Sequence, residues 1–150
     1  MRWRLLETTR AYAVEKLREA GELESTARRG AGYFLALLDR RGDIRLAPPS
    51  YDRFRAHASD IDNIRASIDW ALSSKVDVAL GVSLTAAAAP LWLSMSLLVE
   101  CRHRVQKALR HLTSSDRIER RTELELHAAL ATALKANAST VEISGMKRPK

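Results

Sequence analysis

One stretch of the chain, from Val78 to Val99, contains no charged residue and limits the folds that the whole chain can adopt. It reads VALGVSLTAAAAPLWLSMSLLV, and segments rich in arginine and acidic residues flank it on both sides. About 20 predominantly apolar residues can span a bilayer, but alanine, glycine, serine and threonine add little transfer free energy. A helix that is apolar on all sides also suits the centre of a helical stack. We therefore expect a buried central helix, with a membrane-spanning helix as the alternative.

Prolines and glycines mark the expected breaks between helices. Pro90 lies inside the uncharged stretch and predicts a kink or a helix end, because proline lacks a backbone N–H and its ring clashes with the preceding turn. Pro48 and Pro49 end the stretch GDIRLAPP, and Ser50 can cap the helix that follows. Gly21 follows the first helical pattern, at the position where a C-cap is expected.

Apolar residues recur at helical spacing on both sides of the uncharged stretch, whereas a period-2 pattern is confined to RWRLL near the start. These stripes predict amphipathic helices, each with one face toward a core. The residues expected on inward faces are Leu6, Ala13, Leu17 and Ala20, with Leu5 and Tyr12 at their edge; Leu23, Ala27, Ala31, Phe34, Leu35 and Leu38; Phe54, Ala58, Ile61, Ile64, Ile68 and Leu72; Val105, Leu109 and Leu112 within 98–112; and Leu124, Leu126, Ala128, Leu130, Ala131 and Leu134 within 118–136.

The pattern predicts an all-α fold, an antiparallel array of about six helices that is tetratricopeptide-like, an α–α superhelix. The segment with the stripe from Phe54 to Leu72 and the uncharged stretch 78–99 would form one helical pair. The segments 98–112 and 118–136 would form a second pair, offset from the first by roughly the 34 residues of a tetratricopeptide period. The polar stretch NASTVEISGMKRPK lacks periodicity, and we expect it to be a frayed tail.

Charge and cysteine content narrow the classes of function. The 25 Lys and Arg residues outnumber the 18 Asp and Glu residues, which gives a formal net charge of +7. A basic balance favours contact with nucleic acid or an anionic surface, but acidic residues alternate with the arginines, as in EKLREAGELE, and this favours solvated helix faces. Cys101 is the single cysteine, so an intrachain disulfide is impossible, and we expect a cytoplasmic protein.

No group of residues in the sequence predicts a catalytic, cofactor or metal site. Asp60, Asp62 and Asp69 resemble a carboxylate cluster, but Arg65 lies between them, and we expect a charge network on a helix face. Cys101 and His103 are two residues apart on a helix, so they point to different sides and suit zinc poorly. We therefore expect a protein without enzymatic activity, cofactor or metal.

Three stretches resemble large bacterial transcriptional regulators of the signal-transduction NTPase type, which combine a winged helix, a P-loop ATPase and tetratricopeptide-like repeats. RWRLLETTRAYAVEKL is similar to the segment that follows the ATPase core. DIDNIRASIDWAL resembles the Asp-Asn-hydrophobic-Arg-Ala stretch that begins the helical repeats, and APLWLSMSLLVECRHRVQKAL resembles a Trp-bearing helix that leads into an arginine-rich one. The resemblance covers roughly Arg2 to Leu134.

The resemblance implies a division of the chain into three parts. Residues 1–47 would hold the end of a winged helix, with RWRLL as its last strand, and linking helices; residues 48–136 would hold the repeats, and residues 137–150 the frayed tail. Gly30 stands where the family commonly has a histidine. The 150 residues contain no Gly-x-x-x-x-Gly-Lys-Ser/Thr loop to bind ATP phosphates, and we expect the family's DNA-binding domain to be absent as well. We therefore expect a fragment of such a regulator.

The function expected from these features is a non-catalytic helical-repeat fragment that serves protein interaction or regulation. Its partner would be another protein or the remainder of the regulator, and apolar faces without neighbours predict self-association. The alternative is nucleic-acid binding through a basic winged-helix remnant, with contacts from Arg2, Arg4 and Arg10. A membrane anchor formed by residues 78–99 is the third possibility.

Overall fold

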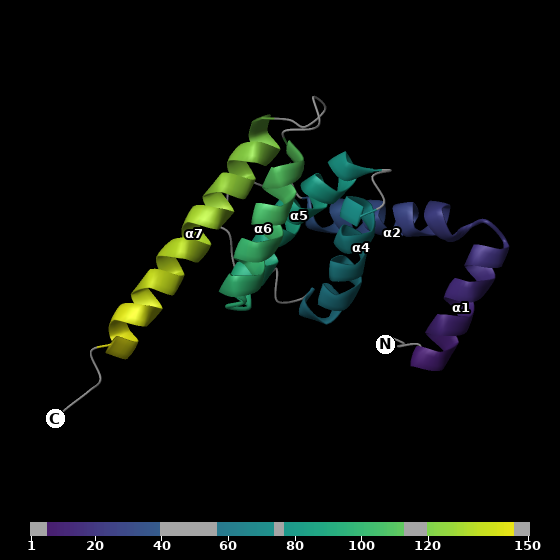
Figure 1. The fold of residues 1–150 in the computed structure, drawn as a ribbon, viewed down its shortest axis with the longest axis horizontal. Helices are drawn as coiled ribbons and strands as arrows, with labels where there is room; N and C mark the ends of the chain where they lie inside the picture. Colours follow the sequence, from purple (N-terminus) through teal and green to yellow (C-terminus); the bar gives the residue numbers. More distant parts are fainter. Residues whose placement is uncertain (1–5, 40–56, 74–76, 113–119, 146–150) are drawn as a thin grey trace.

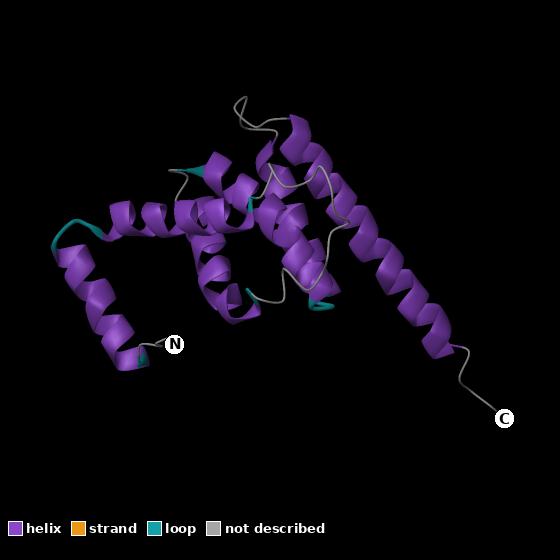
Figure 2. Cartoon of the chain, turned by 180° about the vertical axis from the view of Figure 1, so that it is seen from behind, coloured by secondary structure: helices purple, strands orange, loops and turns teal. Residues whose placement is uncertain are grey.

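The computed structural model describes residues 6–39, 57–73, 77–112 and 120–145, with side chains up to residue 136 (Figure 1). These ranges contain six α-helices and a short 3₁₀ turn, and none of their residues forms a strand (Figure 2). The predicted all-α helical array is therefore confirmed. The elements are α1 (Glu7–Glu19), α2 (Leu23–Leu38), η1 (Ala58–Asp60), α4 (Ile61–Ser73), α5 (Val78–Ser94), α6 (Leu98–Leu112) and α7 (Arg120–Gly145).

The uncharged helix α5 forms the centre of the array, as its sequence predicts. It packs against α2, α4, α6 and α7, and most of its residues are buried; Ser83, Ala87, Pro90 and Ser94 form a partly exposed stripe. Its small side chains allow close approach of the neighbours: a Cβ at Gly81 would lie 2.8 Å from Cδ2 of Leu72 and 3.1 Å from Cβ of Ala71, both on α4. Trp92, near the C-terminal end of α5, is the largest fully buried side chain in the described part of the chain. None of the described helices is both long and apolar enough to cross a bilayer.

Side-chain and backbone caps, and not Pro90, set the ends of α5. At its start the Asp77 carboxylate accepts a hydrogen bond from the Leu80 N–H at 3.3 Å. Pro90 lies within the helix, so the prediction that α5 could end there is wrong. The helix ends instead where Ser96 adopts a left-handed φ of 59° and the Leu97 N–H binds the Trp92 carbonyl at 2.9 Å. This is a Schellman motif.

The stripes predicted for α4 and α6 face the core. On α4 the buried residues include Ile61, Ile64, Ile68 and Leu72. On α6, which begins and ends where the sequence predicts, Val105 is buried, and Leu109 and Leu112 are packed against the core. Phe54, the first member of the α4 stripe, and residues 43–50 with their prolines lie outside the described residues.

The face of α7 that packs on α5 and α6 agrees only in part with the predicted one: Leu126 is buried and Leu130 packs against the core, as predicted. Leu124 and Leu134 were expected to face inward, yet Leu124 is 69% exposed and Leu134 45%. Ala128 and Ala131 are exposed as well. The buried stripe consists of Thr122, Leu126, Ala129 and Ala133. Leucine and alanine occupy both sides of this helix, so its apolar periodicity does not select the buried side.

The helix α1 projects from the body and buries none of its residues (Figure 1). Its apolar stripe was expected to face a core, but Leu6 is 75% exposed and Tyr12 61%. Of the described elements, α2 alone makes more than isolated contacts with α1. The next helix, α2, carries its predicted stripe into the core through Ala31 and Leu38, and it continues without interruption through Gly30.

The C-terminal part of the chain is more regular than its composition suggests. We expected a frayed tail over residues 137–150, but α7 continues to Gly145. An uninterrupted helix can extend through polar residues such as those in NASTVEIS because they need no core to keep their backbone hydrogen bonds. The RWRLL strand expected near the start falls almost wholly on residues outside the described ranges.

Candidate interaction surface

A chain of ion pairs joins α4 to α6, two helices that α5 separates in the sequence. The Arg65 guanidinium on α4 binds both carboxylate oxygens of Glu100 on α6, with Nε 2.7 Å from Oε1 and Nη2 on Oε2. The Nη1 atom of Arg65 also donates to Oδ1 of Asp62 at 2.9 Å, on its own helix. Such a two-pronged contact fixes the relative orientation of the two helices.

The chain of ion pairs continues along α6 and returns to α4. Glu100 also accepts a hydrogen bond from Nε of Arg104, one turn further along α6, at 2.8 Å. Arg104 uses its other nitrogens on Asp69 of α4, with Nη1 3.1 Å from Oδ1. Lys107 approaches the same oxygen at 3.7 Å. Arg65, Glu100, Arg104, Asp69 and Lys107 form what we call the α4–α6 ion-pair chain.

Hydrogen bonding between Arg65 and Glu100 favours the charged forms of these two side chains. The hydrogen bond from Arg65 lowers the pKa of Glu100 below its usual value, and a bond from Arg104 adds to this, while partial burial acts in the opposite direction. The same contact with Glu100 raises the pKa of Arg65. Glu100 therefore stays ionised well into the acidic range.

Arg104 connects the ion-pair chain to the hydrophobic core. Its guanidinium carbon lies 5.7 Å from the centroid of the Trp92 ring, a cation–π arrangement. Trp92 is fully buried near the end of α5. Arg104 thus contacts α4 through Asp69, its own helix through Glu100 and α5 through Trp92, so one side chain positions three helices.

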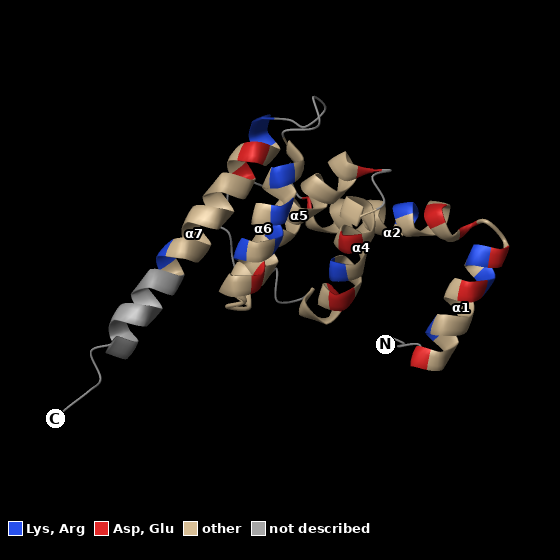
Figure 3. Cartoon of the chain, in the orientation of Figure 1, with Lys and Arg blue, Asp and Glu red and all other residues tan. Residues whose placement is uncertain are grey.

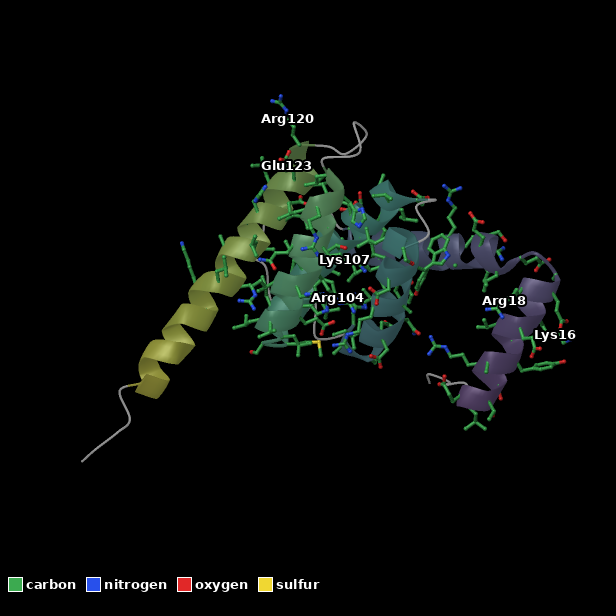
Figure 4. All side chains as sticks on the ribbon, in the orientation of Figure 1. Lys16, Arg18, Arg104, Lys107, Arg120 and Glu123 are labelled. Atoms are coloured by element: carbon green, nitrogen blue, oxygen red, sulfur yellow. The ribbon has the colours of Figure 1, made fainter. Side chains whose placement is uncertain are left out.

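A groove of about 400 Å³ lies beside the ion-pair chain, between α4 and α6. Ile68 and Leu72 of α4, both almost fully buried, form its apolar floor. The polar lining comes from Asp69 of α4 and from Glu100, His103, Arg104 and Lys107 of α6. Arg104 and Lys107 both lie on the side of α6 that faces α4 (Figure 4). A groove with an apolar floor and charged walls can accept a side chain of a polypeptide partner.

The predicted nucleic-acid contacts are not assembled into a site by the described residues. Arg10 is exposed on α1, whereas Arg2 and Arg4 lie outside the described residues. Acidic and basic residues are interspersed along α1 (Figure 3), and Lys16 pairs with Glu19 at 2.6 Å. The described part of α1 therefore carries no stripe of a single charge.

The three aspartates of the α4 segment have different environments. Asp62 pairs with Arg65 on the surface of α4, as predicted, whereas Asp69 pairs with Arg104 of α6. Asp60 was expected on the same helix face as Asp62 and Asp69, but this residue is only 3% exposed to solvent. It belongs to η1, the tighter 3₁₀ turn before α4, which directs its carboxylate inward, 3.9 Å from Nδ1 of His57.

Cys101 and His103 point to different sides of α6, as their spacing predicts. Cys101 is fully buried, and burial raises the pKa of its thiol to about 11. His103 is exposed at the groove. Within the described ranges, no group of three or more His, Cys, Asp or Glu side chains is arranged to hold a metal ion.

Sequence reasoning did not identify Glu100 or the groove. A signal was nevertheless present, because Arg65 and Glu100 are 35 positions apart, as are Asp69 and Arg104. Oppositely charged residues at this separation, close to the 34-residue offset between helical pairs, can meet across equivalent helices. The periodicity of one helix at a time does not reveal such a pairing.

Comparison with known proteins relates the chain to transcriptional regulators. A region of 100 residues, 66% of the chain, is 34% identical to one protein from Mycobacterium bovis and to one from each of two strains of Mycobacterium tuberculosis. Each of them is named “Putative HTH-type transcriptional regulator”. The matched region makes up 11% of the length of each relative. No protein-family model matches the chain, and no solved structure gives a significant match.

Proposed function

We propose that this chain is a non-catalytic helical-repeat module of a cytoplasmic bacterial transcriptional regulator, and that it binds a protein partner. The sequence similarity to HTH-type transcriptional regulators carries the regulatory part of the proposal. The resemblance of three stretches to ATPase-containing regulators supports a place beside an ATPase and a winged helix. The partner is a separate protein or another part of the regulator itself.

The arrangement of the last four described helices supports the repeat interpretation. Two successive pairs, α4 with α5 and α6 with α7, pack against each other. The second helices of the pairs, α5 and α7, are in contact, and the ion-pair chain joins the first helices, α4 and α6. In tetratricopeptide-like arrays, each repeat contacts its neighbours and leaves a continuous face for binding. The groove between α4 and α6 lies on such a face.

Two features support the absence of catalysis. The sequence contains no phosphate-binding loop of the Gly-x-x-x-x-Gly-Lys-Ser/Thr type. The carboxylates at the groove, Asp69 and Glu100, bind arginines, and this favours structural ion pairs over a general acid or base, whose pKa lies near the working pH. We expect no hydrolysis of ATP by the purified chain.

Selection of peptides from a random display library tests the binding function. Peptides selected on the full chain are measured for affinity to two matched variants that each place a tryptophan at an exposed histidine. His103→Trp blocks the groove, whereas His127→Trp changes an exposed position on α7. The proposal expects loss of binding with His103→Trp and unchanged binding with His127→Trp. Equal binding to both variants, or no selected peptide, would contradict it.

Nucleic-acid binding is the second candidate, favoured by the net charge of +7 and by the HTH designation of the relatives. Exposed Arg10, with Arg2 and Arg4, would supply the contacts. Several other arginines, including Arg28 and Arg121, pair with acidic side chains, which reduces the charge available to phosphate. Titration of duplex DNA at several salt concentrations tests this candidate, because phosphate contacts make affinity fall steeply with salt. A flat or absent signal rejects it.

A further inference from the structure

The two helical pairs of the array, α4 with α5 and α6 with α7, meet along two edges that differ in chemistry. Along one edge the second helices, α5 and α7, pack directly against each other. The buried side of α7 includes Leu126, Ala129 and Ala133, and α5 carries no charged residue. This edge is therefore apolar, and salt does not screen contacts between uncharged groups.

Along the other edge the first helices, α4 and α6, are joined by charged side chains that reach across a groove. Among the described elements, α4 and α6 do not belong to the closely packed pairs of helices. The groove of about 400 Å³ lies between them, and its ionised lining is balanced, with Asp69 and Glu100 against Arg104 and Lys107. The groove therefore neutralises its own charges, and the ion-pair chain holds its two walls together.

Solvent reaches most members of the ion-pair chain. The side chain of Asp69 is 53% exposed and that of Lys107 is 35% exposed, whereas Arg104 is only 15% exposed. Arg65 and Glu100 lie between these values, at 31% and 23%. Because the Debye length falls from about 10 Å at 0.1 M salt to about 3 Å at 1 M, salt weakens the more exposed pairs most. The ion-pair chain can therefore loosen while the apolar edge stays intact.

We propose that the α4–α6 ion-pair chain is a salt-sensitive latch, and that the contact between α5 and α7 is the hinge on which it opens. When the ion pairs are formed, they hold the first helices together and fix the angle between the two helical pairs. When water enters between the charged groups, α6 turns away from α4 while α5 and α7 stay in contact. The rotation between neighbouring repeats sets the curvature of the binding face of such an array. This inference goes beyond the proposed function, because the latch acts without a partner.

Opening of the latch requires α6 to roll slightly on α5. The buried residues of α6 are Cys101, Val105 and Ala108, and their side chains are short. The Sγ atom of Cys101 lies 4.0 Å from the carbonyl oxygen of Ala89 on α5, so this side of α6 faces α5. Short side chains form shallow ridges between packed helices. A small rotation of α6 therefore displaces few atoms of α5 and leaves the core closed.

Distances between spin labels on the two edges of the full chain test the proposal. With Cys101→Ala to remove the native thiol, Ala66→Cys and Gln106→Cys place labels at exposed positions of α4 and α6. A second pair, Ser83→Cys and His127→Cys, places labels on α5 and α7. Electron paramagnetic resonance measures each distance at about 0.1 M and about 1 M salt. Circular dichroism at 222 nm checks that every labelled chain is folded.

Two variants break the latch without changing the apolar edge. Glu100→Gln removes the charge that both Arg65 and Arg104 bind. Asp69→Asn removes a carboxylate that is 53% exposed, so this variant keeps its fold even if Glu100→Gln does not. Glu125→Gln is the matched control, because the ion pair of Glu125 lies within α7.

We expect Glu100→Gln to lengthen the α4–α6 distance by about 3 Å, because a water-bridged contact consists of two hydrogen bonds in place of one. Asp69→Asn lengthens it by a smaller amount, since the contact between Arg65 and Glu100 remains. High salt lengthens the same distance when no latch residue is changed, and it adds little in Glu100→Gln, where the latch is already open. The α5–α7 distance stays constant throughout, and Glu125→Gln leaves both distances unchanged.

Three results would overturn this inference. An α4–α6 distance that is the same in Asp69→Asn as in the unaltered chain would show that the ion pairs do not set the angle between the helical pairs. An α4–α6 distance that does not respond to salt would show that the latch is not under ionic control. An equal change in the α5–α7 distance would show that the whole array loosens and that this contact is no hinge. These measurements involve no peptide, so their failure leaves the proposed function unaffected.

Discussion

Replacement of Glu100 by glutamine is expected to destabilise the fold through two arginines at once. Glu100 accepts hydrogen bonds from Nε of Arg65 at 2.7 Å and from Nε of Arg104 at 2.8 Å, and a second nitrogen of Arg65 binds its other oxygen. Glu100→Gln keeps one oxygen acceptor but removes the charge and turns the other group into a donor. Exposed ion pairs contribute up to about 1 kcal/mol and buried pairs about 3–5 kcal/mol when one partner is removed. These side chains are half-buried, so we expect a loss of about 2 kcal/mol at pH 7.

The effect of Glu100→Gln has a characteristic pH dependence. The pKa of Glu100 is lowered in the folded state, chiefly by the hydrogen bond from Arg65, relative to its ordinary value of 4.5. A lowered pKa stabilises the fold above the ordinary value, and this stabilisation is lost as the pH falls through the folded-state pKa. The difference in unfolding free energy between wild type and Glu100→Gln should therefore be greatest near neutral pH and should shrink below pH 4.5.

Urea denaturation followed by circular dichroism at 222 nm measures this difference between neutral and acidic pH. Glu125→Gln is the matched control, because Glu125 pairs with Arg121 at 2.9 Å on the surface of α7 alone. We expect that control to change stability by less than about 0.5 kcal/mol at every pH. The reasoning is refuted if Glu100→Gln is as stable as the wild type at pH 7, or if its deficit is the same at all pH values.

Three further predictions concern packing, reactivity and association. Gly81→Ala should lower the unfolding free energy by about 1–3 kcal/mol, because the added Cβ would lie 2.8 Å from Leu72. Gly30→Ala should raise the unfolding free energy by about 0.5–1 kcal/mol, because no atom lies within 4 Å of the added Cβ, and urea titration compares the two variants. Cys101, with its thiol pKa raised to about 11 by burial, should react with a thiol reagent at pH 8 far more slowly in the folded protein than in urea, and equal rates would disprove the burial. The exposed apolar face of α7 should cause concentration-dependent self-association in sedimentation velocity, and Leu124→Gln should reduce it; a monomer at all concentrations would contradict this expectation.

The central helices could be predicted from the sequence because several independent signals coincide there. The stretch from Val78 lacks charge over its whole length, so a central and largely buried helix follows from composition alone. On α6 the apolar residues are concentrated on one side and basic residues on the other, and the predicted bounds Leu98–Leu112 match the helix. A strong difference between two faces fixes both the helix and its orientation.

Other features depend on contacts that a single helix pattern does not contain. Both sides of α7 carry leucine and alanine, so periodicity could not select the buried side, and packing against α5 and α6 decided it. Asp60 is buried because η1 precedes α4 with a tighter turn than an extrapolated α-helix would have. The pairing of Arg65 with Glu100 requires α4 and α6 to lie together, which only the tertiary arrangement shows.

The proposed binding surface is tested most directly by amide chemical-shift mapping of the labelled full chain with a peptide selected from the display library. The account predicts that the largest shifts fall on the two groove helices, around Ile68 and Leu72 on α4 and around His103 and Lys107 on α6, with α1 and the outer face of α7 unchanged. Shifts centred on α1 or α7, or shifts spread evenly over the molecule, would contradict it.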